Sequence, residues 1–179
     1  MADLNVRDEI HHDRETVYET FRDDLVELVD YLPNIREIEV DSYEQVDENT
    51  VEIVNIWKAT ERDIPSAAQQ FIDSEMLQWH DYATWKQDQW VCEWEMEVDF
   101  MKDAVTCTGE NRYREVGDGK TAIEIDGTLE VDAGEIPGVP GLLAGKVGDA
   151  VENFVVKLIE PNLTDVNRGL EEYLDAQEQ

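Results

Sequence analysis

The most regular feature of the sequence is an alternation of apolar and acidic residues between positions 90 and 100. Successive side chains of a β-strand point to opposite faces, so this pattern predicts a strand with one buried and one solvated face. The expected buried set is Trp90, Cys92, Trp94, Met96, Val98 and Phe100, and Glu or Asp occupies most of the positions between them.

A similar alternation predicts six more strands, which lie at 4–12, 36–46, 50–59, 79–85, 105–114 and 123–131. Short polar or glycine-rich segments separate several of them. Three of these segments are typical of hairpin turns: Asp47-Glu48-Asn49, Gln87-Asp88-Gln89 and Gly117-Asp118-Gly119. The order of strands and turns therefore predicts an antiparallel meander.

Other segments follow a helical period. The first helix is expected between a capping Asp13 and Pro33, with an apolar stripe of Val17, Phe21, Leu25, Leu28, Val29 and Leu32. A short helix is expected at 64–76. A last stripe covers 147–158 and resumes at 163–174, and Pro161 between them predicts two segments with a bend, since proline lacks the N–H that a helix needs. The Gly- and Pro-rich residues 134–148 fit neither period, and they are either a mobile entrance to a pocket or an ordinary connection.

A sheet with one dry face must bury that face against another layer, and the two longer helices are able to cover it. The length of 179 residues suits one domain that spans residues 1–179. We therefore predict the α+β class, with a curved antiparallel sheet of about seven strands around a long C-terminal helix and one helix after the first strand.

This order of elements resembles the START-related, polyketide cyclase-like superfamily, whose architecture is called the helix-grip fold. The resemblance rests on the opening strand, on Val17-Tyr18-Glu19-Thr20-Phe21 leading into Tyr31-Leu32-Pro33-Asn34-Ile35, and on the terminal helix. It implies a cavity between sheet and terminal helix that holds a lipophilic molecule. Some members of this superfamily are enzymes, but none of their catalytic motifs maps onto this sequence residue by residue.

Charge narrows the expected partners. The chain has 14 Lys and Arg against 44 Asp and Glu, for a formal net charge of -30. A polyanion repels phosphate groups, so neither nucleic acid nor an anionic membrane surface is an expected partner. Three interpretations of the charge stay open: a surface that only keeps the protein dissolved, adaptation to high salt, and attraction of a basic partner.

The sequence contains no signal peptide pattern, and no apolar run reaches the ~20 residues of a membrane span. We therefore expect a cytoplasmic protein without integral membrane association. In that compartment Cys92 and Cys107 are expected to be reduced and to serve packing. The oligomeric state stays open.

Apolar side chains at the buried parity are candidates for the wall of a pocket, and the alternative is that they only fill a core. The five tryptophans favour a pocket, since large rings can hold a curved sheet open. The expected lining residues are Trp57, Trp79, Trp85, Trp94, Asn111, Ile123 and Ile125 on the sheet and Val151, Phe154, Val155 and Leu158 on the helix.

Three polar residues, Asn55, Asp81 and Asn111, share the buried parity. A buried polar group needs a hydrogen-bond partner, so each could orient a ligand, and Asp81 could act as a base if desolvation raised its pKa. A register slip of one residue would instead turn them toward solvent.

The three histidines do not predict a metal site. His11 and His12 would point apart on a strand, and His80 would lie on the face opposite Asp81. No cofactor motif is present, so neither a metal nor a cofactor is expected.

We therefore expect a non-enzymatic protein that binds a small lipophilic molecule. The alternative is an enzyme of the polyketide cyclase, aromatase or hydratase type, with Asp81 and Asn111 as weak catalytic candidates. A third hypothesis is an interaction module whose acidic sheet face docks a basic protein. The sequence does not identify the ligand.

Overall fold

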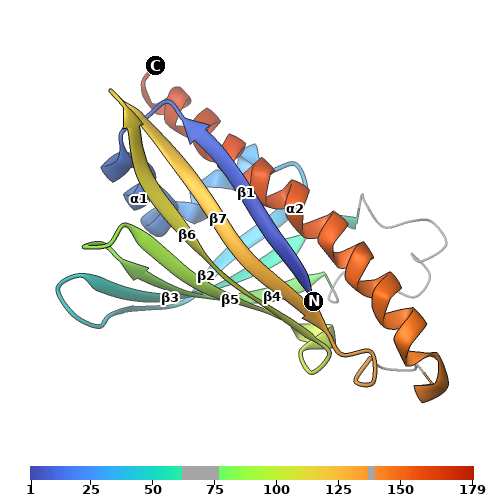
Figure 1. The fold of residues 1–179 in the computed structure, drawn as a ribbon. Coiled ribbons are helices and arrows are strands. Elements are labelled where there is room, and N and C mark those ends of the chain that lie inside the picture. The colour runs from blue at the N-terminus through green and yellow to red at the C-terminus, as the bar shows by residue number, and fades with distance from the viewer. Residues whose placement is uncertain (62–76, 137–139) are drawn as a thin grey trace.

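A computed structural model describes residues 1–61, 77–136 and 140–179, apart from five side chains in the last helix: Val147, Val151, Phe154, Val155 and Leu158 (Figure 1). The helix expected at 64–76 lies outside the described residues. The strands of the described part are β1 (Ala2–Ile10), β2 (Ile35–Gln45), β3 (Thr50–Ala59), β4 (Gln78–Lys86), β5 (Val91–Val98), β6 (Val105–Gly117) and β7 (Lys120–Val131). Its α-helices are α1 (Arg14–Asp23) and α2 (Ala144–Gln177), and its 3-10 helices are η1 (Leu25–Tyr31), η4 (Asp99–Met101) and η5 (Gly141–Leu143).

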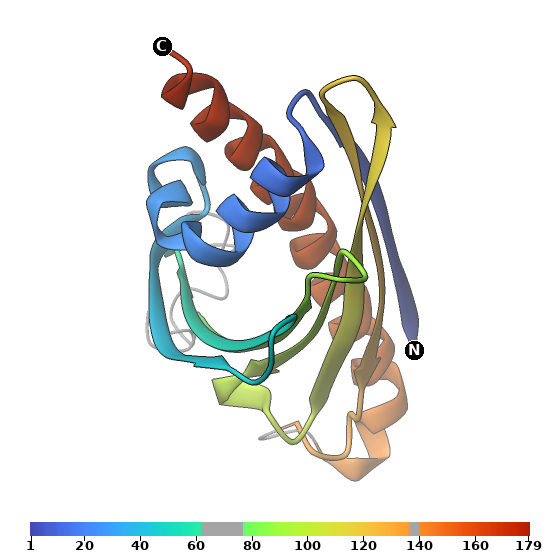
Figure 2. The same cartoon turned by 90° about the vertical axis from the view of Figure 1, so that its left-hand side faces the viewer.

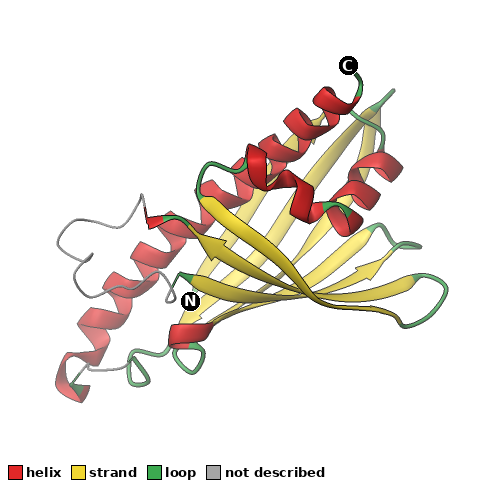
Figure 3. Cartoon of the chain, turned by 180° about the vertical axis from the view of Figure 1, so that it is seen from behind, coloured by secondary structure: helices red, strands yellow, loops and turns green. Residues whose placement is uncertain are grey.

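The strands form one antiparallel sheet in the order β1-β7-β6-β5-β4-β3-β2. Strands β2 to β7 pair with their neighbours in sequence, and β1 is added at the edge beside β7. The sheet curves strongly, and α1, η1 and α2 lie on its concave side (Figure 2). Seen from behind, α1 and η1 cover one end of the curve while α2 crosses the length of the sheet (Figure 3). The predicted class and the helix-grip arrangement are confirmed.

The alternation predicts the two faces of the central strands correctly. Ile53 and Trp94 are buried on the concave face, whereas Glu93 and Glu95 are exposed on the other. The three predicted turns also occur: the first two lie between the end of one strand and the start of the next, and the third begins at Gly117, the last residue of β6.

Strand β5 is shorter than the alternation predicts. Trp90 belongs to the preceding turn with a φ of 55°, and Phe100 lies in a single 3-10 turn where it is 46% exposed. Alternation does not mark the end of strand pairing, because residues in a turn can continue the same order of apolar and polar side chains.

The first helix is divided, which the periodicity does not predict. The Asp13 carboxylate caps α1, because it accepts hydrogen bonds from the backbone N–H and the hydroxyl of Thr16 at 3.0 and 2.7 Å. The α-helix ends at Asp23, and η1 follows. A 3-10 helix places residues i and i+3 on one face, so Leu25 and Leu28 remain buried in the core. The same apolar stripe therefore suits either kind of helix.

Helix α2 is continuous from Ala144 to Gln177 with Pro161 inside it, so the predicted division into two segments is wrong. Pro161 is exposed, and water can bond the carbonyl that lacks a helical partner there. The absence of a side chain at Gly169 permits close packing against the end of η1, because a Cβ atom there would lie 2.6 Å from Leu32 Cδ2.

Polar contacts join α2 to β1 at both ends of the strand. The amino terminus lies 2.7 Å from Glu152, and the Asn167 amide donates a hydrogen bond of 2.7 Å to Asp8. Asn167 is buried, as are Leu170 and Leu174 on the same part of the helix. The C-terminal part of α2 is therefore fixed in the core.

Candidate functional site

The concave face of the central strands carries most of the predicted site residues. Cross-strand pairing arranges them in rows across the sheet. One row consists of Asn55, Asp81, Met96 and Cys107, and the next row consists of Trp57, Trp79 and Val98. Asn55 and Trp57 are buried, whereas Asp81, Met96, Trp79 and Val98 are only half-buried. This end of the wall is mostly apolar and keeps partial access to solvent.

Asp81 lies on the inner wall, in line with the buried Ala83 and Trp85 on the same strand. Burial raises the pKa of its carboxyl to about 6, and the nearby polar groups of Trp57 and Asn55 oppose only part of that rise. The side chain keeps some solvent contact although protein surrounds it, as expected for a carboxyl on a concave wall. Among the described residues, no Lys or Arg pairs with it or lowers its pKa.

The charge of Asp81 acts on other groups of the interior. It contributes to the raised pKa values of three further side chains, whose main cause is burial: Cys92, Cys107 and Tyr113. Asp81 is therefore a negative charge within the concave interior and is not a surface group.

Two tryptophans lie beside Asp81. Trp57 and Trp79 occupy paired positions on β3 and β4, and their rings stack with centroids 5.8 Å apart at an interplanar angle of 13°. The buried indole N–H of Trp57 makes no hydrogen bond of standard geometry among the described residues, but it lies close enough to the Asp81 carboxyl to lower the pKa of that group. Of the two, Trp57 is buried and Trp79 is half-buried, so Trp79 forms the less covered side of this apolar pair.

The opposite end of the concave face is filled by aromatic packing. Tyr18 of α1 meets three rings edge-on, with centroid distances of 5.1–5.2 Å: Trp85, Trp90 and Tyr113. Ile123 and Ile125, which were expected to line a pocket, are 0% and 2% exposed within the same core, and Trp85 is 3% exposed. This end is therefore occupied by the protein's own side chains.

Trp94 has a structural role that its strand position alone does not reveal. Its ring lies over Gly109 and Gly127, where an added Cβ atom would come within 2.4 Å and 2.9 Å of it. Its indole N–H donates a hydrogen bond of 2.8 Å to the side-chain oxygen of Asn111. The Asn111 carbonyl is thus already engaged, so the structure does not bring Asn111 and Asp81 together as an uncommitted pair.

The helical part of the predicted site is only partly described. The side chains of Val151, Phe154, Val155 and Leu158 lie outside the description. The neighbouring residues Val156, Ile159 and Leu163 are half-buried and pack against the core.

The histidines contact acidic side chains. His11 and His12 lie beyond the end of β1, not within a strand as expected. His11 Nδ1 is 2.6 Å from a Glu171 oxygen and His12 Nε2 is 2.8 Å from an Asp175 oxygen, so both residues attach the end of β1 to the last turns of α2.

Two clusters bring possible metal-ligand atoms within 4.8 Å of one another: His12 with Asp175 and Glu178, and His80 with Glu97 and Asp99. His80 lies on the face opposite Asp81, and its Nδ1 is 2.6 Å from an Asp99 oxygen. Each cluster thus contains a short imidazole–carboxylate contact, and such a contact accounts for the grouping without a metal ion.

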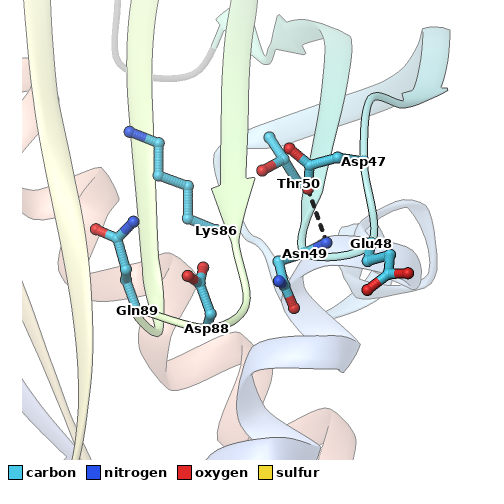
Figure 4. A pocket seen from close by; sticks show the side chains of 7 residues that line it. All are labelled: Asp47, Glu48, Asn49, Thr50, Lys86, Asp88 and Gln89. Carbon is cyan, nitrogen blue, oxygen red and sulfur yellow. Dashed lines mark hydrogen bonds between the residues drawn. The ribbon is translucent and has the colours of Figure 1, made fainter.

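Among the hollows of the described part of the protein, two lie outside the space between sheet and α2. The first, of about 530 Å³, lies between the β2–β3 and β4–β5 turns and is lined by polar side chains that include Asp47, Lys86 and Asp88 (Figure 4). The second lies on the outer face over β1, β6 and β7. Neither contains a predicted ligand-binding residue.

Met96 and Val98 are half-buried on the same end of the wall, and the sequence placed them on the buried face without including them among the expected lining residues. Their parity was visible in the alternation of β5, but parity does not distinguish a filled core position from an exposed wall position.

None of the helices in the described ranges combines the length and apolarity that crossing a membrane requires.

Comparison with solved structures identifies the same fold. TTHA0849 from Thermus thermophilus is 18% identical with a TM-score of 0.69, over 99% of this chain and 100% of that one. The Zhui aromatase/cyclase from Streptomyces sp. R1128 is 11% identical with a TM-score of 0.67, over 99% and 96%. A START superfamily protein from Mycobacterium smegmatis is 12% identical with a TM-score of 0.58, over 98% of each chain.

A search among curated proteins finds no match. A family model described as "Protein of unknown function (DUF2505)" matches residues 5–162, which is most of the chain. The chain shares the helix-grip fold with the START superfamily protein from Mycobacterium smegmatis, and it belongs to the DUF2505 family.

Proposed function

We propose that the protein binds a small hydrophobic or lipid-like molecule against the half-buried end of the concave wall. The main support is the contrast between the two ends of this wall. Around Tyr18 the interior is closed by aromatic packing, whereas Trp79, Met96 and Val98 present apolar surface that the described side chains do not cover. Apolar surface that keeps access to water gains free energy when a ligand covers it.

The fold is consistent with this proposal, since the structures that share it include a START superfamily protein and an aromatase/cyclase. The proposed site uses the sheet residues Trp57 and Trp79 of the expected set, whereas Trp85, Ile123 and Ile125 contribute to the closed core. The part of α2 that faces the wall would provide the second side of the site.

The test is displacement of an environment-sensitive hydrophobic dye by a lipid extract, with native mass spectrometry to identify retained molecules. Met96→Trp should abolish dye binding, because the larger ring occupies the wall position beside Asp81. Glu95→Trp adds the same ring on the exposed outer face and should leave dye binding unchanged. Equal dye binding by both variants would reject the proposed location.

A second function has a specific observation in its favour. A carboxyl with a pKa of about 6 exchanges protons efficiently near neutral pH, so Asp81 suits general base catalysis on a bound polyketide-like substrate. Mass spectrometry of products formed from a synthetic poly-β-ketone would test this activity. Turnover by the native protein and none by Asp81→Asn would favour the enzyme, and binding without turnover would favour the binding protein.

A further inference from the structure

Asp81 distinguishes the proposed site from a purely apolar wall. Its carboxylate lies within the concave interior, and neither a hydrogen-bonded cation nor an ion pair to Lys or Arg is present among the described residues. An ionised carboxylate loses hydration when it is surrounded by protein, and a neighbouring positive charge offsets this loss most effectively.

The groups around Asp81 also favour a cation. The stacked Trp57 and Trp79 rings lie one row along the sheet, and the face of an indole attracts ammonium groups. Trp79 is half-buried, so the described residues do not cover it completely. The net charge of -30 raises the local concentration of cations and lowers that of anions near the protein.

We propose that the molecule bound at this wall is an organic amine, whose ammonium group pairs with the Asp81 carboxylate while its hydrocarbon part lies against the Trp57–Trp79 stack. This inference rests on the proposed binding function and adds the chemical class of the ligand. A carboxylic acid of the same shape would place two negative charges together and is excluded. A neutral alcohol could donate one hydrogen bond but would leave the charge of Asp81 uncompensated.

The experiment compares three probes that share one hydrocarbon chain: octylamine, octanol and octanoate. Binding to the full-length protein is measured by isothermal titration calorimetry below the aggregation concentration of each probe. Salt is added to screen the exposed charges, because screening weakens surface attraction more than an ion pair in a partly enclosed site. Octylamine should bind about ten- to a hundredfold more tightly than octanol, as expected for a charge-assisted hydrogen bond, and octanoate should bind most weakly.

Two variants locate the effect. Asp81→Asn keeps the shape of the side chain but removes its charge, so octylamine affinity should fall to about that of octanol while octanol binding changes little. Asp41→Asn removes the same charge from an exposed position on β2 and should leave all three affinities unchanged. Circular dichroism of both variants checks that each keeps the native fold.

The possible failures are distinguishable. If octanol binds as tightly as octylamine, or if Asp81→Asn keeps the preference for octylamine, the amine assignment is overturned and the binding function stands. If no probe binds the native protein, both the amine assignment and the proposed binding of small apolar molecules are overturned. If Asp41→Asn loses the preference as well, the preference comes from the surface charge and the assignment to Asp81 is wrong.

Discussion

Replacement of Asp81 by asparagine should stabilise the folded protein at neutral pH. The pKa of this carboxyl is raised from the ordinary 3.8 to about 6, and the main cause is burial. A raised pKa means that ionisation of Asp81 costs free energy in the folded state. Asparagine has nearly the same shape but cannot ionise, so Asp81→Asn removes that cost.

The size of the effect follows from the difference between the folded and unfolded pKa values. One pKa unit corresponds to about 1.4 kcal/mol, so a rise from 3.8 to about 6 corresponds to roughly 3 kcal/mol when Asp81 is fully ionised. The cost is absent below the unfolded pKa of 3.8, grows as pH rises, and is complete above about 6. Linkage gives about half of it near pH 5 and nearly all of it near pH 7.5.

The assay is urea unfolding followed by tryptophan fluorescence, at about pH 5 and about pH 7.5 with constant salt. The stability of Asp81→Asn relative to the native protein should increase by about 1.4 kcal/mol between these two pH values. This change between pH values is the diagnostic quantity, since any loss of polar contacts with Asn55 or Trp57 is nearly the same at both. Asp41→Asn, an exposed aspartate replaced in the same way, should show no such change.

One result would refute the reasoning. If Asp81→Asn lowers stability more at about pH 7.5 than at about pH 5, the ionised carboxylate stabilises the fold. Asp81 would then have a cationic partner within the protein, and the argument for an amine ligand would lose its basis.

Three further predictions concern the frame of the site. Gly127→Ala should destabilise the protein by about 1–3 kcal/mol in urea unfolding, because the new Cβ would lie 2.9 Å from the Trp94 ring, whereas Gly141→Ala meets no atom within 4 Å and should have little effect. Asn167→Ala should cost about 1–3 kcal/mol, because the buried hydrogen bond to Asp8 joins α2 to β1, and unchanged hydrogen exchange of the α2 amides would contradict this role. Added salt should raise the melting temperature, since screening reduces the mutual repulsion within a chain of net charge -30, and a melting temperature independent of salt would disprove this.

The sequence by itself determined the faces of the sheet and the order of its elements. Alternation is a local property of an extended chain, so the buried side of β5 could be assigned from Cys92, Trp94 and Met96 before the structure was known. The hairpin turns and the cap at Asp13 are equally local, and they too were predicted correctly. Local chemistry was enough for the order of β2 to β7, because consecutive antiparallel strands usually pair with each other, whereas the pairing of β1 with β7 joins the two ends of the meander and is a long-range contact.

Only the tertiary structure decided which inward residues fill the core and which remain half-buried. Trp85 and Trp79 have the same parity on β4. Tyr18, from a helix distant in sequence, packs against Trp85, whereas Trp79 stays half-buried. Likewise Asn111 became a partner of Trp94 because Gly109 and Gly127 leave space for that ring. These outcomes depend on packing between segments far apart in the chain, which periodicity does not encode. The environment of Asp81 has the same origin, since its desolvation arises from the strands and side chains that surround it and not from its neighbours in sequence.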